Sequence, residues 1–522
     1  MTAETTLEAR LERLEDCDPT LLRSGLKGLE KESLRVTPEG RISTTPHPPA
    51  LGSALTHPNI TTDYSEALLE FVTPPHAATE ETLRFLCELQ GFTYRRIQPE
   101  MLWVTSMPCA VQGDASIPIA NYGSSNVGFM KHVYRRGLDW RYGRVMQAIS
   151  GIHFNFSAAE GLWDQLLIEE NPDNGRRCRS AALFGLIRNF QRYGWLIPFL
   201  FGASPAICKS FMGGRKHNFE AFDEHTLYAP WATSLRMSDI GYKNKAQASL
   251  RVSTNSLAEY VASLGNAIHT PDPEYQRIGV CVDGEWRQLN ANVLQIENEY
   301  YSFVRPKNIA RSGEKPTHAL KRAGVRYVEI RALDVNAFDP MGVSRQTLDF
   351  LEAFLLFCLL RPSAPIDDAE QARIDHNQRE VAVRGRQDGL RLRAASGEVL
   401  LSDWAEAILA DMEPLCRLLD RGDASRRYSH ALENQLARVR DPDLTPSARV
   451  LAEMRQRRES FFEFGLRQSL EHADFFRSMP YDPGRDADLD RLARESIQHQ
   501  AELEHADQAP FEEFLAEYFA RD

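Results

Sequence analysis

The chain has 522 residues, of which 43% are hydrophobic and 26% charged, and its formal net charge is -12. This length exceeds one ordinary compact core, so two domains, or one large domain with a helical appendage, are expected. The negative charge argues against nucleic-acid binding as the main activity, although a local basic groove would be compatible with it. The longest apolar run, residues 195–208, is broken by Pro198, Gly202 and Pro205, so no membrane span is predicted.

The eight cysteines are spread along the chain, and none of them forms a CxxC pair. This distribution is typical neither of a zinc site nor of a secreted disulfide scaffold. The N-terminal segment MTAETTLEARLERLEDCDPT is acidic and lacks the apolar core of a signal peptide. We therefore expect a cytoplasmic protein.

Hydrophobic periodicity predicts the secondary structure in chain order. Three segments have the apolar spacing of helices: residues 5–16, 78–100 and 178–200. Between the first two, residues 25–75 are strand-rich, and the Gly-, Pro- and Ser-marked residues 106–130 predict a long active-site loop. Three further segments are predicted as strands with polar groups on one face: SGIHFNFS (150–157), VLQIENEYY (293–301) and VRYVEIRALDVN (325–336).

From about residue 345 the pattern becomes almost entirely helical. We therefore predict an α+β body over residues 1–345, carrying the ATP, metal and substrate sites. A mainly helical C-terminal portion, residues 346–522, is predicted to pack on this body.

Carboxylates recur on the predicted strands. In GLEKESLRV (28–36), Glu30 and Glu32 lie on one face because side chains alternate along a strand. Like charges on one face repel each other, and a cation bound between them would remove that repulsion. Mg²⁺ or Mn²⁺ takes oxygen ligands, often with phosphates completing the shell. Such a cluster would clamp a polyphosphate and stabilise the charge that develops in phosphoryl transfer.

Other polar side chains also share a strand face, and some of them could have a purely structural role instead of a functional one. On these patterns the further candidates are Glu66 and Glu70 (with Asp63 if EALLEF is a helix), Glu297 and Glu299, Tyr327, Glu329 and Arg331, and His153 with Asn155. Glu297 and Glu299 are equally compatible with a solvated face. A structural salt bridge competes for Glu329 and Arg331, and a packed polar residue for His153.

Phosphate binding would depend on basic residues, because the chain has no Walker A sequence. GSSNVGFMK (123–131) has the GxxxxG spacing but lacks the Lys-Ser/Thr that follows it in a P-loop. The candidates are Arg135, Arg305, Lys307 and Arg311. The loop RPKNIARSGEKP (305–316) is equally compatible with an ordinary solvated loop.

Seven segments together resemble a known family. They are GLEKESLRV, LGSALTHPNITTDYSEALLEFVTP, ISGIHFNFS, LFGASPAIC, ATSLRMSDIGYKNKAQ, VLQIENEYY and YVEIRALDVN. In this order, over most of residues 20–345, they resemble the monofunctional proteobacterial glutamate–cysteine ligases. DPDLTPSARVL (441–451) continues the resemblance more weakly.

The resemblance implies an ATP-dependent carboxylate–amine ligase. Such enzymes use Mg²⁺, with Mn²⁺ as an alternative, to phosphorylate the γ-carboxylate of L-glutamate, and the amine of L-cysteine then displaces phosphate. The product is γ-glutamylcysteine, in the first step of glutathione biosynthesis. The implied fold is a curved, mainly antiparallel sheet funnel resembling the glutamine synthetase catalytic domain. We expect a monomer or weak oligomer without nucleic-acid or membrane partners.

The matching motifs also imply roles for residues of this chain. The implied metal ligands are Glu30, Glu32, Asp63, Glu70, His153 and Glu329. The implied catalytic arginines are Arg236 and Arg331, since a guanidinium fork suits both carboxylate and phosphate. The implied substrate-binding residues are Tyr134, Tyr242, Asn298 and Tyr301, and Gln147 is predicted to join them. Of the basic candidates, Arg135 and Arg311 are predicted to bind the nucleotide. The resemblance does not support Glu66, Glu297 or Glu299 as ligands.

Three alternatives stay open at this point. A ligase on the same fold could join glutamate to a different amine. A non-catalytic binding protein would be expected to have lost acidic ligands, and no such loss is visible. A metal-dependent phosphohydrolase could use the acidic cluster alone and would hydrolyse ATP without an amine.

Overall fold

A computed structural model describes residues 6–166, 175–240, 250–311, 313–507 and 509–521. Within these ranges, no helix is both long and apolar enough to cross a membrane.

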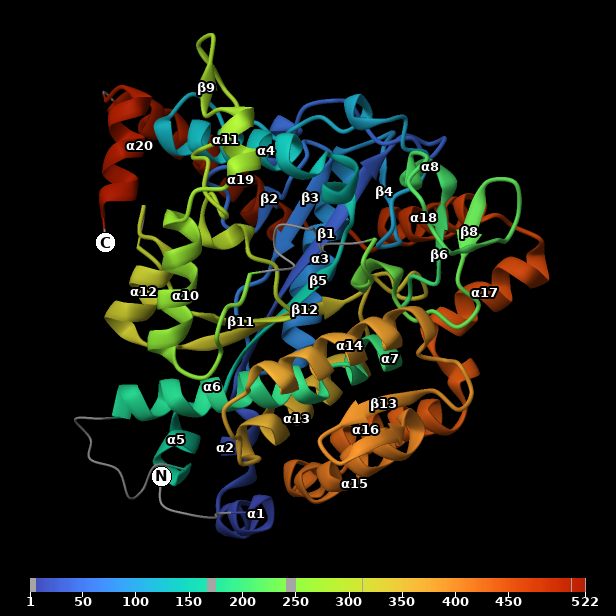
Figure 1. Cartoon of the computed structure of the whole chain (residues 1–522). Coiled ribbons are helices and arrows are strands. Elements are labelled where there is room, and N and C mark those ends of the chain that lie inside the picture. The colour runs from blue at the N-terminus through green and yellow to red at the C-terminus, as the bar shows by residue number, and fades with distance from the viewer. Residues whose placement is uncertain (1–5, 167–174, 241–249, 312, 508, 522) are drawn as a thin grey trace.

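The centre of the molecule is an antiparallel, strongly twisted sheet (Figure 1). Its strands are β1 (Leu26–Val36), β2 (Ile60–Thr62), β3 (Leu68–Val72), β4 (Met101–Leu102), β5 (Ile152–Ser157), β11 (Val304–Lys307) and β12 (Tyr327–Leu333). They follow the order β11-β12-β5-β1-β3-β2, β4 pairs with the end of β1, and every pairing is antiparallel. The long central strand β1 therefore has partners on both edges.

Smaller sheets lie outside this centre. Their strands are β6 (Ala206–Cys208), β7 (Glu220–Ala221), β8 (Thr226–Tyr228), β9 (Cys281–Val282), β10 (Glu285–Trp286), β13 (Arg391–Ala394) and β14 (Gly397–Leu400). The hairpin β13–β14 interrupts the C-terminal segment that the sequence predicts as almost all helix.

Helices surround the central sheet. Those of the first 345 residues are α1 (Leu7–Glu15), α2 (Pro19–Arg23), α3 (Thr79–Arg96), α4 (Asn126–Tyr142), α5 (Glu160–Leu166), α6 (Gly175–Tyr193), α7 (Leu196–Phe201), α8 (Lys209–Met212), α10 (Leu257–His269), α11 (Pro273–Ile278) and α12 (Pro316–Ala323). Short 3-10 turns are η1 (Pro49–Leu51), η2 (Asp114–Ser116), η3 (Val145–Ala148), η5 (Leu235–Met237), η6 (Glu297–Glu299) and η7 (Pro442–Leu444). The helices predicted at 5–16, 78–100 and 178–200 are confirmed.

The C-terminal helices pack on several sides of the central sheet. They are α13 (Arg345–Leu360), α14 (Asp368–Arg384), α15 (Leu401–Asp420), α16 (Arg427–Arg440), α17 (Pro446–Arg457), α18 (Phe461–Ser478), α19 (Pro483–Ala506) and α20 (Phe511–Ala520). Helices α13 to α16 gather at one end of the sheet, whereas α20 lies against α4 at the opposite end (Figure 1). The boundary near residue 345 stays a prediction.

Strand β1 places opposite chemistry on its two faces. Leu29 on the rear face is fully buried, and the neighbouring rear residue Lys27 is buried as well. The Lys27 Nζ donates to Glu352 Oε1 of α13 at 2.7 Å, and the Tyr428 hydroxyl of α16 donates to Glu352 Oε2 at 2.8 Å. The front face carries Glu30 and Glu32. Helices α13 and α16 therefore hold the strand from behind through a buried charged network, while its carboxylates face forward.

One predicted strand is wrong. The central part of VLQIENEYY folds as the 3-10 turn η6, and Glu297 and Glu299 are buried instead of facing a common groove. Each of these glutamates accepts hydrogen bonds from neighbouring elements, which a flat strand would not allow. The strands predicted at 150–157 and 325–336 are confirmed as β5 and β12.

Cys109 and Cys208 are joined by a disulfide across 99 residues of sequence. Cysteine spacing gave no indication of this pair. The bond ties the predicted 106–130 loop to β6, and α4 begins inside that segment at Asn126.

Candidate active site

The strand register aligns polar side chains across the front face of the sheet. Glu30 lies opposite His153 of β5, and Glu32 lies opposite Glu70 of β3. On the other side of β5, Glu329 of β12 lies opposite Asn155. Because β1 is central, residues from four strands meet on one surface.

His153 lies at the centre of this group. Its Nδ1 is 2.9 Å from Glu30 Oε2 and 3.5 Å from Glu329 Oε1, and its Nε2 is 3.6 Å from Glu32 Oε1. Asn155 Nδ2 donates to the other oxygen of Glu30 at 2.9 Å. Glu30 and Glu32, which the sequence places on one strand face, thus both lie next to the His153 imidazole.

Three cationic side chains border the carboxylates. Arg331 Nη1 donates to Glu329 Oε1 at 2.9 Å, and Lys307 Nζ is 3.3 Å from Glu329 Oε2. Arg236 Nη2 donates to the backbone carbonyl of Arg331 at 3.0 Å. Negative and positive charge therefore meet along one line, as a site for phosphates and carboxylates requires.

The pKa values of the carboxyl groups diverge. Burial, with Glu30, Asp63 and Glu32 adding to it, raises the pKa of Glu70 well above its ordinary value. Burial also raises the pKa of Glu32, with Asp63 adding to it. Burial acts in the same direction on Glu329, but Lys307, Arg331 and His153 outweigh it and hold that pKa well below the ordinary value.

The pKa of Glu30 is lowered because the His153 hydrogen bond and Lys307 outweigh burial and the neighbouring Glu329. Divergent environments of this kind are typical of functional sites. The two carboxyls whose pKa values are raised, Glu32 and Glu70, face each other across the pairing of β1 and β3.

The donor set fits a divalent cation. Single ligand atoms of Glu30, Glu70 and His153 all lie within 4.8 Å of one another. Among the described residues, Asn155 Oδ1 of this group is buried without a hydrogen-bond partner, and Glu329 Oε2 has only the ion pair with Lys307 and no hydrogen bond. Carboxylate oxygens suit Mg²⁺, and an imidazole nitrogen in the set suits Mn²⁺ as well.

Asp63 lies just beyond β2, on the same side as Glu70. Its backbone carbonyl accepts hydrogen bonds from Arg135 Nε and, at 2.9 Å, from the Tyr122 hydroxyl. The Asp63 charge contributes to the raised pKa of both Glu32 and Glu70. Asp63 is therefore near the cluster without belonging to its tightest part.

Gly151, directly before β5, holds two members of the site. Its N–H donates to Glu32 Oε2 at 2.7 Å. A Cβ at this position would lie 2.0 Å from Arg236 Nη2 and 2.6 Å from its Cζ. The Arg236 guanidinium therefore lies directly over a backbone that only glycine allows.

Gly151→Ala is expected to displace Arg236, which is predicted to hold substrate, and to lower kcat/KM by roughly 10²-fold, the effect of a shift of about 1 Å in such a group. Steady-state kinetics at saturating ATP would measure it. Gly265→Ala in α10 is the matched control, since nothing lies within 4 Å of its added Cβ. Full activity of Gly151→Ala would show that Arg236 need not lie where the structure places it.

Sequence analysis missed Asp334, the residue that supports Arg236 from behind. Asp334 is buried at the end of β12, with Oδ1 3.7 Å from Arg236 Nη1. It also accepts hydrogen bonds from Ser234 Oγ at 2.8 Å and from the Ala203 N–H at 2.9 Å. The sequence feature that could have indicated Asp334 is an aspartate directly after the apolar residues of a predicted strand.

Three of the predicted substrate residues lie on different elements. Tyr134 is on α4, Gln147 is in η3, and Asn298 is in η6. The Tyr301 hydroxyl lies 3.4 Å from Met237 Sδ, next to Arg236, and burial raises the pKa of this tyrosine. Tyr242 lies outside the described residues.

The two predicted nucleotide arginines differ in position. Arg135 on α4 reaches Asp63, and its guanidinium lies 4.6 Å from the centre of the Tyr122 ring. Arg311 is exposed on the loop after β11, where its N–H donates to Glu314 Oε2 at 2.8 Å. The structure brings only Arg135 to the acidic cluster.

The acidic residues that the resemblance set aside have structural partners. Glu66 precedes β3 and accepts hydrogen bonds from the backbone N–H groups of His47 at 2.6 Å and Asn121 at 2.7 Å. Glu297 Oε1 accepts from Thr317 Oγ1 at 2.5 Å. These side chains fix loops and do not join the cluster.

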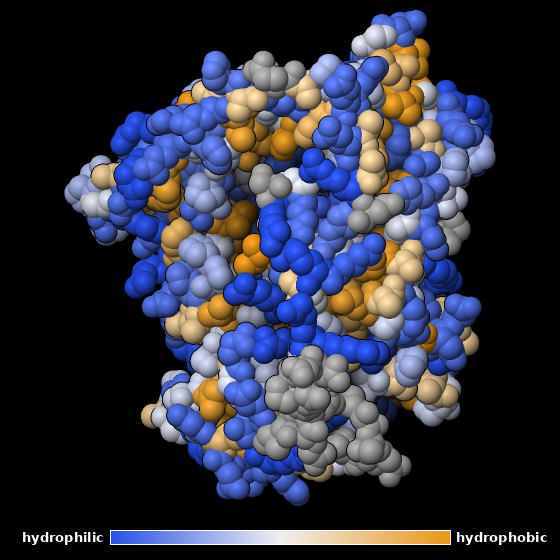
Figure 2. Space-filling view, turned by 90° about the vertical axis from the view of Figure 1, so that its left-hand side faces the viewer, coloured by the Kyte–Doolittle hydropathy of each residue, from blue (hydrophilic) through white to orange (hydrophobic). Residues whose placement is uncertain are grey.

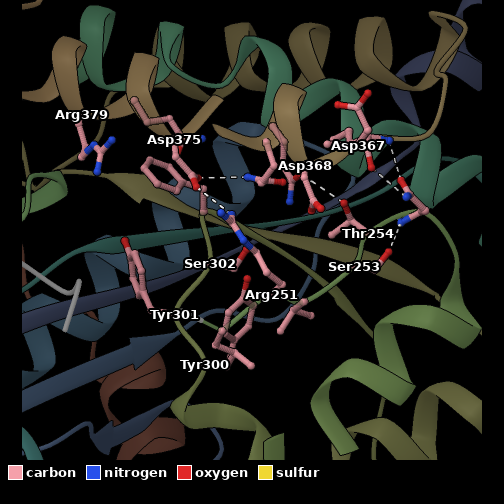
Figure 3. Close-up of a pocket in the computed structure, with 18 of the residues that line it drawn as sticks. Arg251, Ser253, Thr254, Tyr300, Tyr301, Ser302, Asp367, Asp368, Asp375 and Arg379 are labelled. Atoms are coloured by element: carbon pink, nitrogen blue, oxygen red, sulfur yellow. Dashed lines mark hydrogen bonds and ion pairs between the residues drawn. The ribbon is translucent and has the colours of Figure 1, made fainter. Parts of the chain in front are cut away.

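A cavity of about 740 Å³ opens beside Tyr301 (Figure 3). Arg251 and Asp375 form an ion pair of 3.4 Å on one wall, and Arg379 projects from α14 on the same side as Tyr301. None of the clustered carboxylates lines this cavity. Hydrophilic residues dominate the face of the molecule in Figure 2, and hydrophobic groups lie between them, mainly near the top and right of the centre.

Comparison with known proteins gives the family. A family model described as glutamate-cysteine ligase matches residues 11–381. The chain belongs to the glutamate–cysteine ligase family. The glutamate–cysteine ligase of Alcanivorax borkumensis is 48% identical over 522 residues, covering 98% of this chain and 99% of that protein. That of Pseudomonas entomophila is 50% identical over 501 residues, covering 96% of this chain and 94% of that protein.

A solved structure agrees with this family. The glutamate–cysteine ligase of Francisella tularensis, in complex with AMP, has a TM-score of 0.89 and 36% identity, and covers 95% of this chain and 97% of that chain. A bifunctional glutathione synthetase from Pasteurella multocida has a TM-score of 0.74 and 25% identity, and covers 92% of this chain and 57% of that one. The glutamate–cysteine ligase fold therefore extends through the C-terminal helices.

Proposed function

We propose that the chain joins the γ-carboxylate of L-glutamate to the amine of L-cysteine in an ATP-dependent reaction through a γ-glutamyl phosphate. Family membership gives it the class of glutamate–cysteine ligase, EC 6.3.2.2, which catalyses the first step of glutathione synthesis. The observation that carries the detailed proposal is the line of carboxylates bordered by Arg236, Lys307 and Arg331 on one sheet face.

Glu30, Glu32, Asp63, Glu70, His153 and Glu329 would hold divalent cations, Mg²⁺ or Mn²⁺. Bound there, such ions would neutralise the charge of the nucleotide phosphates and of the transferred group. Arg135 would add positive charge at the Asp63 side of the cluster. Arg311 would have to reach the nucleotide from its exposed loop.

The arginines have a direct role in this scheme. A carboxylate is a poor electrophile because its negative charge repels a nucleophile. Arg331 and Arg236 would orient the γ-carboxylate for attack on the terminal phosphorus of ATP, with ADP as the leaving group. An oxygen–phosphorus bond forms, and the bond between that phosphorus and ADP breaks.

The second step forms the amide. The cysteine amine attacks the activated carbonyl carbon, a C–N bond forms, and phosphate leaves while the amine loses its proton. Tyr134, Gln147, Tyr242, Asn298 and Tyr301 would surround the incoming cysteine. The Tyr301 hydroxyl contacts Met237, the residue after Arg236, which would place the amine next to the acyl phosphate.

Phosphate release from Mg·ATP tests this proposal, with glutamate present and with cysteine, 2-aminobutyrate or no amine added. Release should require glutamate and rise strongly with cysteine. Release independent of glutamate would indicate a phosphohydrolase. Dependence on glutamate without response to cysteine would indicate a ligase for a different amine.

Several finer expectations are part of the same proposal. The curved antiparallel sheet would present its ligands as in the catalytic domain of glutamine synthetase. A cytoplasmic location and a monomeric or weakly associating state are also proposed. Sedimentation at several protein concentrations would test the association state.

A further inference from the structure

We propose that Glu299 and Arg141 are positioning residues for the amine substrate, because their buried ion pair fixes the acceptor segment, residues 295–301, against α4. This inference deepens the proposed function and rests on it. Neither residue belongs to the carboxylate cluster, and neither is among the residues predicted to bind substrate.

Glu299 is fully engaged inside the protein. Its side chain is 1% exposed, and its Oε1 is 3.0 Å from Arg141 Nη1. The Tyr142 hydroxyl donates to the same oxygen at 2.6 Å, and the Gln295 N–H donates to Oε2 at 2.6 Å. The Glu299 carboxylate therefore connects the last turn of α4 with the backbone of Gln295, at the start of the acceptor segment.

Arg141 is equally constrained. Its side chain is 0% exposed, and its Nη2 donates to Gln288 Oε1 at 2.8 Å and to the carbonyl of Asn290 at 2.8 Å. Its guanidinium also lies 4.0 Å from the centre of the Tyr275 ring. A guanidinium with these contacts has one orientation, so the carboxylate that it holds has one position as well.

The same segment has two further attachments. Glu297 accepts from Thr317 of α12, and Arg305 Nη2 donates to the carbonyls of Asn298, at 3.1 Å, and Tyr300. Asn298 itself is exposed between the two buried glutamates. The two buried glutamates therefore hold the backbone on either side of Asn298, so the exposed Asn298 side chain has a fixed position from which it can contact a ligand.

The ion pair also links the two halves of the proposed amine pocket. Helix α4 carries Tyr134, whose backbone carbonyl accepts from Gln295 Nε2 at 3.2 Å. The acceptor segment carries Asn298 and Tyr301. Loss of the pair should therefore change the distance between Tyr134 and these residues and leave Glu30, His153 and Glu329 in place, since those are held by the sheet.

Glu299→Gln tests this assignment. Glutamine keeps the volume and one acceptor oxygen but leaves the Arg141 charge without a counter-charge. The KM for cysteine is expected to rise about tenfold or more, as for partners that orient a ligand. Glutamate-dependent phosphate release without cysteine should stay within about twofold of wild type, because that step does not use the amine pocket.

Asp486→Asn is the matched control. Asp486 is 6% exposed and accepts from Arg95 and Arg96, whose side chains are 29% and 15% exposed, so it belongs to a partly buried charge cluster between α3 and α19. We expect this variant to lose thermal stability without any change in the KM for cysteine. An equal rise in that KM in both variants would reduce Glu299 to a purely structural residue and overturn the proposal.

Tyr142→Phe keeps the assignment testable if Glu299→Gln does not fold. It removes the 2.6 Å hydrogen bond to Glu299 but retains the ion pair. The KM for cysteine should rise by a smaller factor, about threefold, and the KM for glutamate should not change. An unchanged KM for cysteine in Tyr142→Phe and in folded Glu299→Gln would contradict the proposal. Wild-type protein that does not respond to cysteine would instead contradict the proposed function.

Discussion

Glu30→Gln is expected to lower kcat/KM for glutamate-dependent ATP turnover by about 10²–10³-fold, the range for losing one preorganised electrostatic contact to the reacting groups. Glu30 is the residue to which the cluster is most closely tied. Its two oxygens face His153 at 2.9 Å and Asn155 at 2.9 Å, and its strand lies at the centre of the sheet. An amide keeps the shape of the side chain but is a neutral and weak ligand for a hard cation.

The measurement is a titration of activity with Mg²⁺ at fixed ATP, with thermal unfolding recorded beside it. Glu30→Gln should require more Mg²⁺ for half-maximal activity, whereas its melting temperature without cation should change little. Wild-type Mg²⁺ dependence in this variant would remove Glu30 from the metal ligands.

Glu66→Gln is the matched control for Glu30. Glu66 lies four residues before Glu70 and accepts two backbone N–H groups away from the cluster. The NH₂ group of glutamine cannot accept a hydrogen bond, so one of the two backbone N–H groups would lose its acceptor. We therefore expect a loss of about 1–3 kcal/mol in the free energy of unfolding. The Mg²⁺ dependence of its activity should match wild type, which separates stability from catalysis.

Arg331→Lys is expected to lower kcat by about 10²-fold and to raise the KM for glutamate. Lysine retains the positive charge near Glu329 but lacks the planar guanidinium, so the substitution tests whether the geometry of the guanidinium matters in addition to its charge. A guanidinium offers several donors in one plane, and an ammonium cannot hold a carboxylate and a phosphate oxygen in the same geometry. The bond from Arg331 Nη1 to Glu329 at 2.9 Å uses only part of that donor set.

Arg326→Lys is the control for this second change. Arg326 is exposed one residue before β12, so the same substitution is made on the same segment but outside the site. Steady-state kinetics with varied glutamate would compare the two variants. Equal kinetics for both would show that Arg331 acts only as a point charge.

Alternation along a strand made much of the site predictable. It placed Glu30 with Glu32 and His153 with Asn155 on common faces, and the structure confirms both faces. Alternation does not give the pairing of one strand with another, so the contact between His153 and Glu30 depends on the register of β1 and β5. That register cannot be predicted from the alternation of side chains or from the charge pattern.

The same rule failed at VLQIENEYY. Glu297 and Glu299 have the spacing of a strand face, but the segment turns as a 3-10 helix because each glutamate finds a buried partner, Thr317 or Arg141. Those partners lie 20 and 158 residues away. Local pattern is a weak predictor where distant hydrogen bonds decide the backbone.

Arg236 illustrates a third case. Its position depends on Gly151 having no side chain and on Asp334 lying behind it. Both conditions follow from three-dimensional packing, and only the type of each residue is visible in the sequence.

The contact between Lys27 and Glu352 has a consequence for the integrity of the enzyme. Lys27 is on the strand that carries Glu30, yet its counter-charge and the hydroxyl that completes the network belong to α13 and α16. In the full chain, loss of the Glu352 carboxylate alone would leave the Lys27 ammonium group buried and unpaired, a cost of about 3–5 kcal/mol for pairs of this kind. The C-terminal helices therefore neutralise the reverse side of the strand that carries Glu30, so the charge balance of β1 depends on residues on both sides of position 345.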